Sequence, residues 1–527
     1  MNSQTVKGLI NKALLKNKLL SVLGLAITAI VIIGVMVGGF LDMQAKAQFV
    51  DKTLPGKFGR MFNNLPPFAP PNPTVQAALM EMGKPGGILD AKDNLAAGPI
   101  ALITNPALNV NNPNNPTHTA GTTFMSQFMD LDITHDTTSR LGQVTAPVTA
   151  PNARTAAFDL DNVYGDGPVG SPNLYDPKDP IKLRLETGGL FEDLPREANN
   201  RAIIADPRGD QHLIISGLVS AFFSFHNHAV DLVRSQSPAI SNDEAFSKAR
   251  QLTTWHYQWM ILHEFLPLLV GQNMVNDILN NGRMFYNPLP NRAFIPVEFQ
   301  VGYRFGHSMI RPSYRANLAG DNGQPFFAFI FDPSQEGKPD PDDLRGRARA
   351  PRRFIGWQTF FDFGDTQVRP NKLIDTKISS PLFNLPLQTI GSGTPPTSLI
   401  QRNLLRHLTW QLPSGQDVAR KMGVTVLSKN DLAELRSIYP SFDSSTPLWY
   451  YILKEAELRE KGLHLGQVGG RIVGEVILGL LQLDSNSYLN VNPAWKPTLP
   501  TKTGKPENFR MIDFLTFAGV DPASRGQ

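Results

Sequence analysis

Four segments of this sequence carry the hydrophobic pattern of an α-helix, and they limit the folds that the chain can adopt. They are residues 213–235, 243–270, 399–406 and 469–483. In each one the apolar residues recur every three or four positions, which places them on one face of a helix. Runs with the alternating pattern of a strand are short and scattered. We therefore predict a mainly α protein, with a single large helical domain and long irregular loops.

Composition excludes several classes of protein. At 527 residues, 41% of them hydrophobic, the chain can bury a large core. Its net charge of +4 is small for this length and its Lys and Arg residues are dispersed, so no nucleic-acid partner is predicted. The chain has no cysteine, which excludes disulfides and cysteine-ligated metal sites.

The first 47 residues have the features of an export segment. Four lysines come first, at Lys7, Lys12, Lys16 and Lys18. An uncharged apolar run at residues 19–40 follows and is long enough for a helix to cross a bilayer. Ala45 and Ala47 then form an A-x-A-like cleavage site. Residues 1–47 are therefore either a cleaved signal peptide or a retained signal anchor. Both interpretations predict that the rest of the chain lies outside the cytoplasm, secreted or anchored to the membrane.

The next segment, residues 48–122, has a different composition. It is rich in Pro, Asn and Gly, as in PPFAPPNP at residues 66–73 and NVNNPNNPTH at residues 109–118. Such composition is typical of extended segments and turns. We predict an N-terminal arm with little regular structure, followed by the main domain at residues 123–527.

Polar groups occur at helical spacing in residues 124–140, which read FMSQFMDLDITHDTTSR. Gln127, Leu131 and His135 are four residues apart, so on a helix they would share one face. Taken alone, the segment is also explained by an amphipathic surface helix with a solvated acidic edge. Later segments favour a functional site instead.

Together with three later segments, residues 124–140 resemble the animal-type haem peroxidase, or peroxidase–cyclooxygenase, superfamily. Those segments are TAAFDLDNVYG at residues 155–165, YRFGHSMIRP at residues 303–312 and RNLLRHLTWQLP at residues 402–413. Their order and distances agree with that superfamily, and the resemblance runs from about residue 124 to about residue 483. It implies a haem-peroxidase-like helical domain at residues 123–527 that binds haem b and Ca²⁺.

The resemblance assigns most of the haem site residue by residue. His307 is the expected proximal ligand of the haem iron, and Asn403 holds its second ring nitrogen. Arg304 and Arg406 are expected at the haem propionates. Arg208 matches the distal arginine that polarises peroxide.

One position departs from the family pattern. The family has Gln-x-x-x-His-Asp on the distal side, and here Gln127 and Asp132 match while Leu131 replaces the histidine. Asp130 matches one carboxylate that forms an ester to haem in the family. Gln211 stands at the other ester position, where an amide cannot form that bond. Whether the haem is ester-linked stays open.

A calcium site is also implied. Its expected ligands are Asp132, Thr155, the carbonyl of Ala157, Asp159 and Asp161. Calcium takes six to eight oxygen ligands from carboxylates, hydroxyls and carbonyls, and this loop supplies all three kinds. The alternative is an Asx-rich turn that holds no ion.

Leu131 leaves the function open, because leucine cannot move the proton that the distal histidine transfers during peroxide cleavage. His135 and His212 are the candidate substitutes, assisted by Arg208 and Gln127. We expect a peroxidase that reduces H2O2 or an organic hydroperoxide and oxidises a small organic or halide donor. A catalytically impaired haem-binding protein of the cell surface and a fatty-acid oxygenase are the alternatives. Arg304 stands where cyclooxygenases have their radical-forming tyrosine, which disfavours prostaglandin-type chemistry.

Overall fold

A computed structural model describes residues 56–289 and 292–527. Residues Pro55–Gln527 form one compact unit. The predicted export segment at residues 1–47, with its apolar run at residues 19–40, lies outside the described residues.

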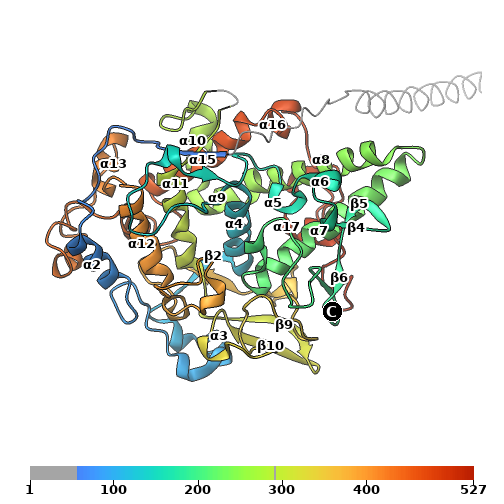
Figure 1. The fold of residues 1–527 in the computed structure, drawn as a ribbon, viewed down its shortest axis with the longest axis horizontal. Helices are drawn as coiled ribbons and strands as arrows, with labels where there is room; N and C mark the ends of the chain where they lie inside the picture. Colours follow the sequence, from blue (N-terminus) through green and yellow to red (C-terminus); the bar gives the residue numbers. More distant parts are fainter. Residues whose placement is uncertain (1–55, 290–291) are drawn as a thin grey trace, which may run out of the picture. The chain divides into compact units, whose positions relative to one another are not determined.

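The described part of the chain is mainly helical, as predicted (Figure 1). The helices are α2 (Pro73–Met82), α3 (Gly98–Thr104), α4 (Ala120–Ile133), α5 (Asp161–Tyr164), α6 (Gly167–Gly170), α7 (Leu213–Gln236), α8 (Asn242–Met260), α9 (Leu266–Val270), α10 (Gln272–Asn281), α11 (Val297–Gly302), α12 (Leu399–Thr409), α13 (Gly415–Met422), α14 (Leu448–Arg459), α15 (Gln467–Leu483), α16 (Tyr488–Val491) and α17 (Met511–Phe517). Two 3-10 helices matter for the site, η5 (Pro207–Asp210) and η7 (Tyr303–Met309).

The strands form small, separate sheets. They are β1 (Gly56–Gly59), β2 (Asn114–Thr119), β3 (Pro151–Asn152), β4 (Tyr175–Asp176), β5 (Asp179–Leu183), β6 (Glu186–Thr187), β7 (Glu192–Asp193), β8 (Ile295–Pro296), β9 (Ser313–Asp321), β10 (Gln324–Phe329) and β11 (Pro370–Lys372). The order β3-β1-β8 makes a three-stranded sheet, and the remaining strands pair two by two. The β9–β10 hairpin turns at Asn322 and Gly323, which both have a positive φ, as the tightest hairpin turns require.

The four predicted helical segments are all helices in the structure. Residues 213–235 correspond to α7, and residues 399–406 and 469–483 to α12 and α15. Residues 243–270 form α8 and α9, joined by a π-helical turn at Ile261–Phe265. Among the described helices α7 alone is long and apolar enough to span a membrane, but 78% of its most apolar window is buried inside the protein.

The prediction of an irregular arm was wrong for its described part, which starts at residue 56. That part contains β1, α2, α3 and β2. Helix α2 begins because Asn72 caps it, with Oδ1 accepting the Val75 amide at 2.9 Å, and because Pro73 at the first position already has a helical φ. α2 then packs against α12. These local start signals outweigh the proline-rich composition.

Helix α4 lies in the interior and contacts α5, α7, η5, η7 and β11. In Figure 1 it runs through the middle of the unit, with α12 on one side and α7 on the other. It ends at Ile133, and Thr134 already has extended dihedrals. The prediction of one helical face that includes His135 was therefore wrong.

The end of α4 has a long-range cause. The side-chain amide of Asn152 donates to the Ile133 carbonyl at 2.8 Å, and its Oδ1 accepts the His135 amide at 2.7 Å. Both backbone groups would otherwise continue the helix. Asn152 is 1% exposed and follows 19 residues later, so the sequence pattern of residues 124–140 does not contain this signal.

Candidate functional site

His307 lies in η7, directly after α11, and η7 packs against α4, α14 and β11. Its Nδ1 is 2.7 Å from the side-chain nitrogen of Asn403 on α12. The Asn403 Oδ1 is buried and has no hydrogen-bond partner among the described residues. Turning this amide by 180° lets the Nδ1–H of His307 donate to Oδ1 of Asn403. In that tautomer Nε2 carries the lone pair that a metal ligand needs.

The surroundings keep the imidazole neutral. Burial, and secondly the charge of Arg304, lowers the pKa of His307 to about 3. A Cβ placed on the preceding Gly306 would meet no atom within 4 Å, so there is open space beside the histidine. A neutral, oriented imidazole next to open space fits a haem iron ligand.

The charges of two arginines, Arg304 and Arg406, interact in this part of the chain. The Nε of Arg304 is buried and has no hydrogen-bond partner in the described chain. Burial, and then the charge of Arg406, lowers the pKa of Arg304 to about 9. Arg406 itself binds Asp136 at 3.1 Å. Because two guanidiniums that repel each other are stabilised by carboxylates, this pair fits the propionates of a haem.

On the distal side, Leu131 is 4% exposed and its carbonyl accepts Nη2 of Arg208 at 3.0 Å. Arg208 also forms an ion pair with Asp206, at 2.6 Å from Nη2 to Oδ2. Burial alone would raise the pKa of Asp206, but the guanidiniums of Arg208 and Arg154 outweigh burial and hold it well below its usual range. A permanent carboxylate therefore orients Arg208, the residue expected as the distal arginine.

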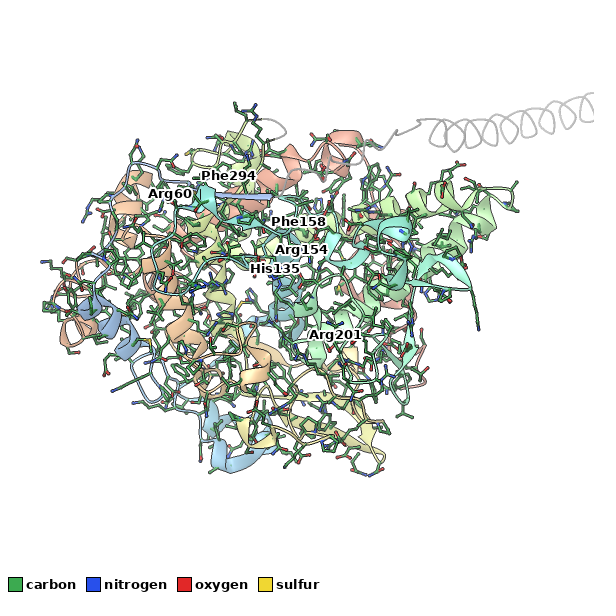
Figure 2. All side chains as sticks on the ribbon, in the orientation of Figure 1. Arg60, His135, Arg154, Phe158, Arg201 and Phe294 are labelled. Atoms are coloured by element: carbon green, nitrogen blue, oxygen red, sulfur yellow. The ribbon has the colours of Figure 1, made fainter. Side chains whose placement is uncertain are left out.

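His135 belongs to the same cluster although it is not helical. Its Nδ1 is 4.0 Å from Oδ2 of Asp206, and the ring is partly exposed. Figure 2 shows His135 next to Arg154 in the middle of the unit. Burial, followed by the charge of Arg208, lowers the pKa of His135 to about 4. At neutral pH this histidine is an uncharged proton acceptor.

His212 is placed differently. It caps α7, with Nδ1 accepting the Ile215 amide at 3.3 Å, and its Nε2 is 2.9 Å from Oε1 of Gln127. Nε2 of the same Gln127 amide donates to Oε1 of Gln211 at 3.5 Å. Both ring nitrogens of His212 are therefore engaged, whereas His135 keeps its ring partly open to solvent.

Asp130 is partly exposed, and Oδ1 accepts the hydroxyl of Thr134 at 3.1 Å. That contact holds the carboxylate against the end of α4. Within residues 56–289 and 292–527, no hydrogen bond or ion pair joins Asp130 to the histidines of the site.

The predicted calcium ligands come together. Oxygens of Asp132, Asp159 and Asp161 lie within 4.8 Å of one another. Both oxygens of Asp132 are buried without a hydrogen bond of normal geometry in the described residues, although the Leu160 amide and the Tyr257 hydroxyl face them. Burial, and secondly the other two carboxylates, raises the pKa of Asp132 well above its usual value. A buried carboxylate that forms no ion pair among the described residues, beside two other carboxylates, fits a cation site.

The loop itself is built for oxygen donors. Thr155 donates from its hydroxyl to Asp159 at 2.8 Å, so its oxygen lies at the site. Leu160 has φ 60°, and this left-handed turn brings Asp159 and Asp161 to the same side. Ala157 lies between them and Thr155 and offers only its carbonyl.

Sequence reasoning gave no role to three residues that connect these parts. Asp206 pairs with Arg208, Arg154 pairs with Asp206, and Asn152 fixes the segment that carries His135. Arg154 directly precedes the Thr155 motif and Asp206 stands two residues before Arg208. Their positions beside recognised motifs were a usable signal, but their contacts join distant segments.

Comparisons with known proteins agree with the helical fold. Residues 98–334 match the family model for animal haem peroxidase. The probable oxidoreductase PXDNL of Homo sapiens is 28% identical over 219 residues, which make up 37% of this chain and 15% of that protein. Peroxidase A from Dictyostelium discoideum has a similar structure, with a TM-score of 0.54 at 16% identity, covering 72% of this chain and 81% of that one. The fatty acid alpha-dioxygenase of Arabidopsis thaliana gives a TM-score of 0.55 at 14% identity, over 88% and 76% of the two chains.

The helical fold is similar to that of a haem-peroxidase structure, and the His307–Asn403 pair beside the buried Nε of Arg304 fits a haem site. Over residues 98–334 the chain resembles the animal haem peroxidase superfamily, and its fold agrees with that resemblance. That superfamily implies haem. The family match spans Arg304 and His307 and ends before α12, which carries Asn403.

Proposed function

We propose that this chain is a haem peroxidase that reduces H2O2 or an organic hydroperoxide and oxidises a small organic or halide donor. The observation that carries the proposal is the neutral His307, held at 2.7 Å by Asn403 next to the unpartnered Nε of Arg304. Haem b, when bound, supplies the two electrons that cleave the O–O bond. The chain has no cysteine, so neither a thiolate ligand nor a c-type attachment competes with His307.

Proximal residues hold the cofactor. With haem bound, Nε2 of His307 would be the iron ligand, Asn403 would fix the angle of the ring, and Arg304 and Arg406 would bind the propionates. Asp130 keeps one ester-forming carboxylate of the family and Gln211 lacks the other, so we propose at most one ester link, through Asp130.

On the distal side, His135 accepts the proton of peroxide in place of the histidine that Leu131 replaces. Asp206 and Arg208 flank it, and Arg208 stabilises the negative charge that develops on the peroxide oxygen. Gln127 and His212 bond to each other and support this wall of the pocket. His212 is the weaker candidate because both its nitrogens are engaged.

We also propose a calcium ion bound by Asp132, Thr155, the carbonyl of Ala157, Asp159 and Asp161. Export rests on the sequence of residues 1–47 alone, so location outside the cytoplasm, secreted or anchored through residues 19–40, is part of the same proposal.

The test is the rate of oxidation of a phenolic dye by H2O2 in the haem-loaded chain. We expect His135→Ala to lower kcat about 10²-fold or more, the range of general acid–base catalysis, and His212→Ala to lower it less. Equal rates in wild type and His135→Ala would exclude His135 as the proton acceptor. Bound haem without turnover would favour the impaired haem-binding protein.

A second candidate function is fatty-acid oxygenation. It is favoured by the buried Leu131, which offers an apolar side chain where the family has an imidazole. Oxygen uptake that requires a fatty acid and proceeds without added peroxide would support it. Dye oxidation with peroxide, without such uptake, would contradict it.

A further inference from the structure

One arginine joins the proposed cation site to the distal side. Nη1 of Arg154 is 3.4 Å from Oδ1 of Asp161, and its Nε is 3.0 Å from Oδ2 of Asp206. Its Nη2 donates to the Ala205 carbonyl at 3.2 Å. Asn152 accepts the backbone amide of Arg154 at 3.3 Å and so fixes where the side chain starts. One guanidinium therefore binds both Asp161, a carboxylate of the proposed cation site, and Asp206, the partner of Arg208.

Asp206 is shared in turn. Its carboxylate, 2% exposed, binds Arg154 and also takes Nε of Arg208 at 3.0 Å and Nη2 at 2.6 Å. Two guanidiniums thus compete for one buried carboxylate. Arg208 also donates to the Leu131 carbonyl, and Leu131 directly precedes Asp132. The contacts form a closed path from the cation site to the distal arginine and back.

The charges of these residues predict how a bound cation would change the ion pairs along this path. A divalent cation bound at Asp161 competes with Arg154 for the same carboxylate and repels its guanidinium. Arg154 then interacts more strongly with Asp206, which weakens the hold of Asp206 on Arg208. Without the cation, Arg154 interacts more strongly with Asp161. Asp206 then interacts mainly with Arg208.

We propose that Arg154 and Asp206 are positioning residues that couple occupancy of the cation site to the placement of Arg208. The inference rests on the proposed haem and calcium sites. Coupling between two sites is reciprocal, so a change at Asp206 must alter cation affinity.

The first experiment is a titration of the calcium-depleted full-length chain with Ca²⁺ and, as a luminescent probe, with Tb³⁺. We expect Asp206→Asn to weaken binding about fivefold or more, because Arg154 then pairs only with Asp161. Arg154→Gln should strengthen binding, and the double variant should bind like Arg154→Gln alone. Arg154→Lys, which keeps the charge, should retain an effect of Asp206→Asn and serves as the second variant if Arg154→Gln does not fold.

Arg250 supplies a matched control. It is another arginine at the loop, with Nη2 donating to the Asp159 carbonyl at 3.2 Å, and no contact joins it to Asp206. In an Arg250→Gln background, Asp206→Asn should still weaken cation binding. If Asp206→Asn leaves affinity unchanged in the wild type, or has the same effect with and without Arg154, the coupling is overturned.

The second experiment measures the affinity of the haem-loaded chain for cyanide, with Ca²⁺ and with a chelator. We expect calcium to change this affinity in the wild type and to leave it unchanged in Arg154→Gln. A calcium effect that persists in Arg154→Gln would overturn the route through Arg154. If no haem binds, the proposed function fails, while the cation titration still decides the coupling. If no variant binds a cation, the coupling and the calcium proposal fail together.

Discussion

Leu131 puts a hydrocarbon side chain where the superfamily pattern has an imidazole, while Asp132 beside it keeps the geometry of a cation ligand. A leucine can pack in that position but cannot transfer a proton. The nearby imidazole of His135 is neutral and partly exposed, and a carboxylate and a guanidinium flank it. At the scale of single residues, we propose that His135, from the segment after α4, takes over the proton transfer that Leu131 cannot perform.

Leu131→His tests this replacement. Restoring an imidazole at the family position should raise kcat for H2O2-dependent dye oxidation, by up to about 10²-fold, because the base would then lie on α4. It should also make the rate less sensitive to His135→Ala. Leu131→Gln is the control, since it adds polarity without a base. A rate that falls equally in both variants would mean that the apolar side chain is itself required.

At the scale of elements, Asn152 decides where α4 stops. It satisfies the Ile133 carbonyl and the His135 amide, two groups that a longer helix would have used internally. The segment after α4 is therefore extended, and it places His135 beside Asp206.

Asn152→Ala should lower the free energy of unfolding by about 2–4 kcal/mol, because it leaves buried backbone groups without partners. Urea unfolding measures the loss. Asn199→Ala is the matched control, since Asn199 is exposed and its side chain contacts only the exposed Arg201 amide and Glu197, so the change should stay within about 0.5 kcal/mol. A similar small loss in both variants would contradict the role given to Asn152.

The helices that follow apolar periodicity, such as α7 and α15, could be predicted because the signal lies within the element itself. The end of α4 could not, because Thr134 and His135 continue the local pattern while the competing partner Asn152 is distant in sequence. For the same reason the motifs pointed to His307 and Arg208 but not to Asp206, whose role depends on contacts between separate segments. The helix α2 was missed because composition was given more weight than its Asn-Pro start.

At the scale of the whole molecule, a buried carboxylate links one helix to the start of the next. Glu455 on α14 is 3% exposed and accepts the amides of Val468 and Gly469 at the start of α15, at 3.0 and 3.3 Å. Burial raises its pKa from 4.5 to about 7, although these amides oppose the shift. The folded protein therefore holds a proton that the unfolded chain releases above pH 4.5.

This shift makes stability depend on pH. The contribution of Glu455 is fully present below about pH 4.5 and is lost as the pH rises through about 7, a loss of about 3 kcal/mol. Glu455→Gln should remove that part of the dependence. Urea unfolding at pH 5 and pH 8 measures the difference. An equal change in both proteins would contradict a raised pKa at Glu455.

The most direct test of the account is the absorption spectrum of the haem-loaded chain with and without His307. We expect the wild type to show the Soret band of a histidine-ligated haem, His307→Ala to lose it, and added imidazole to restore it in the variant. His228→Ala, a change at an exposed histidine, should leave the band unchanged. An identical Soret band in wild type and His307→Ala, or none in either, would contradict the central claim that His307 binds haem iron.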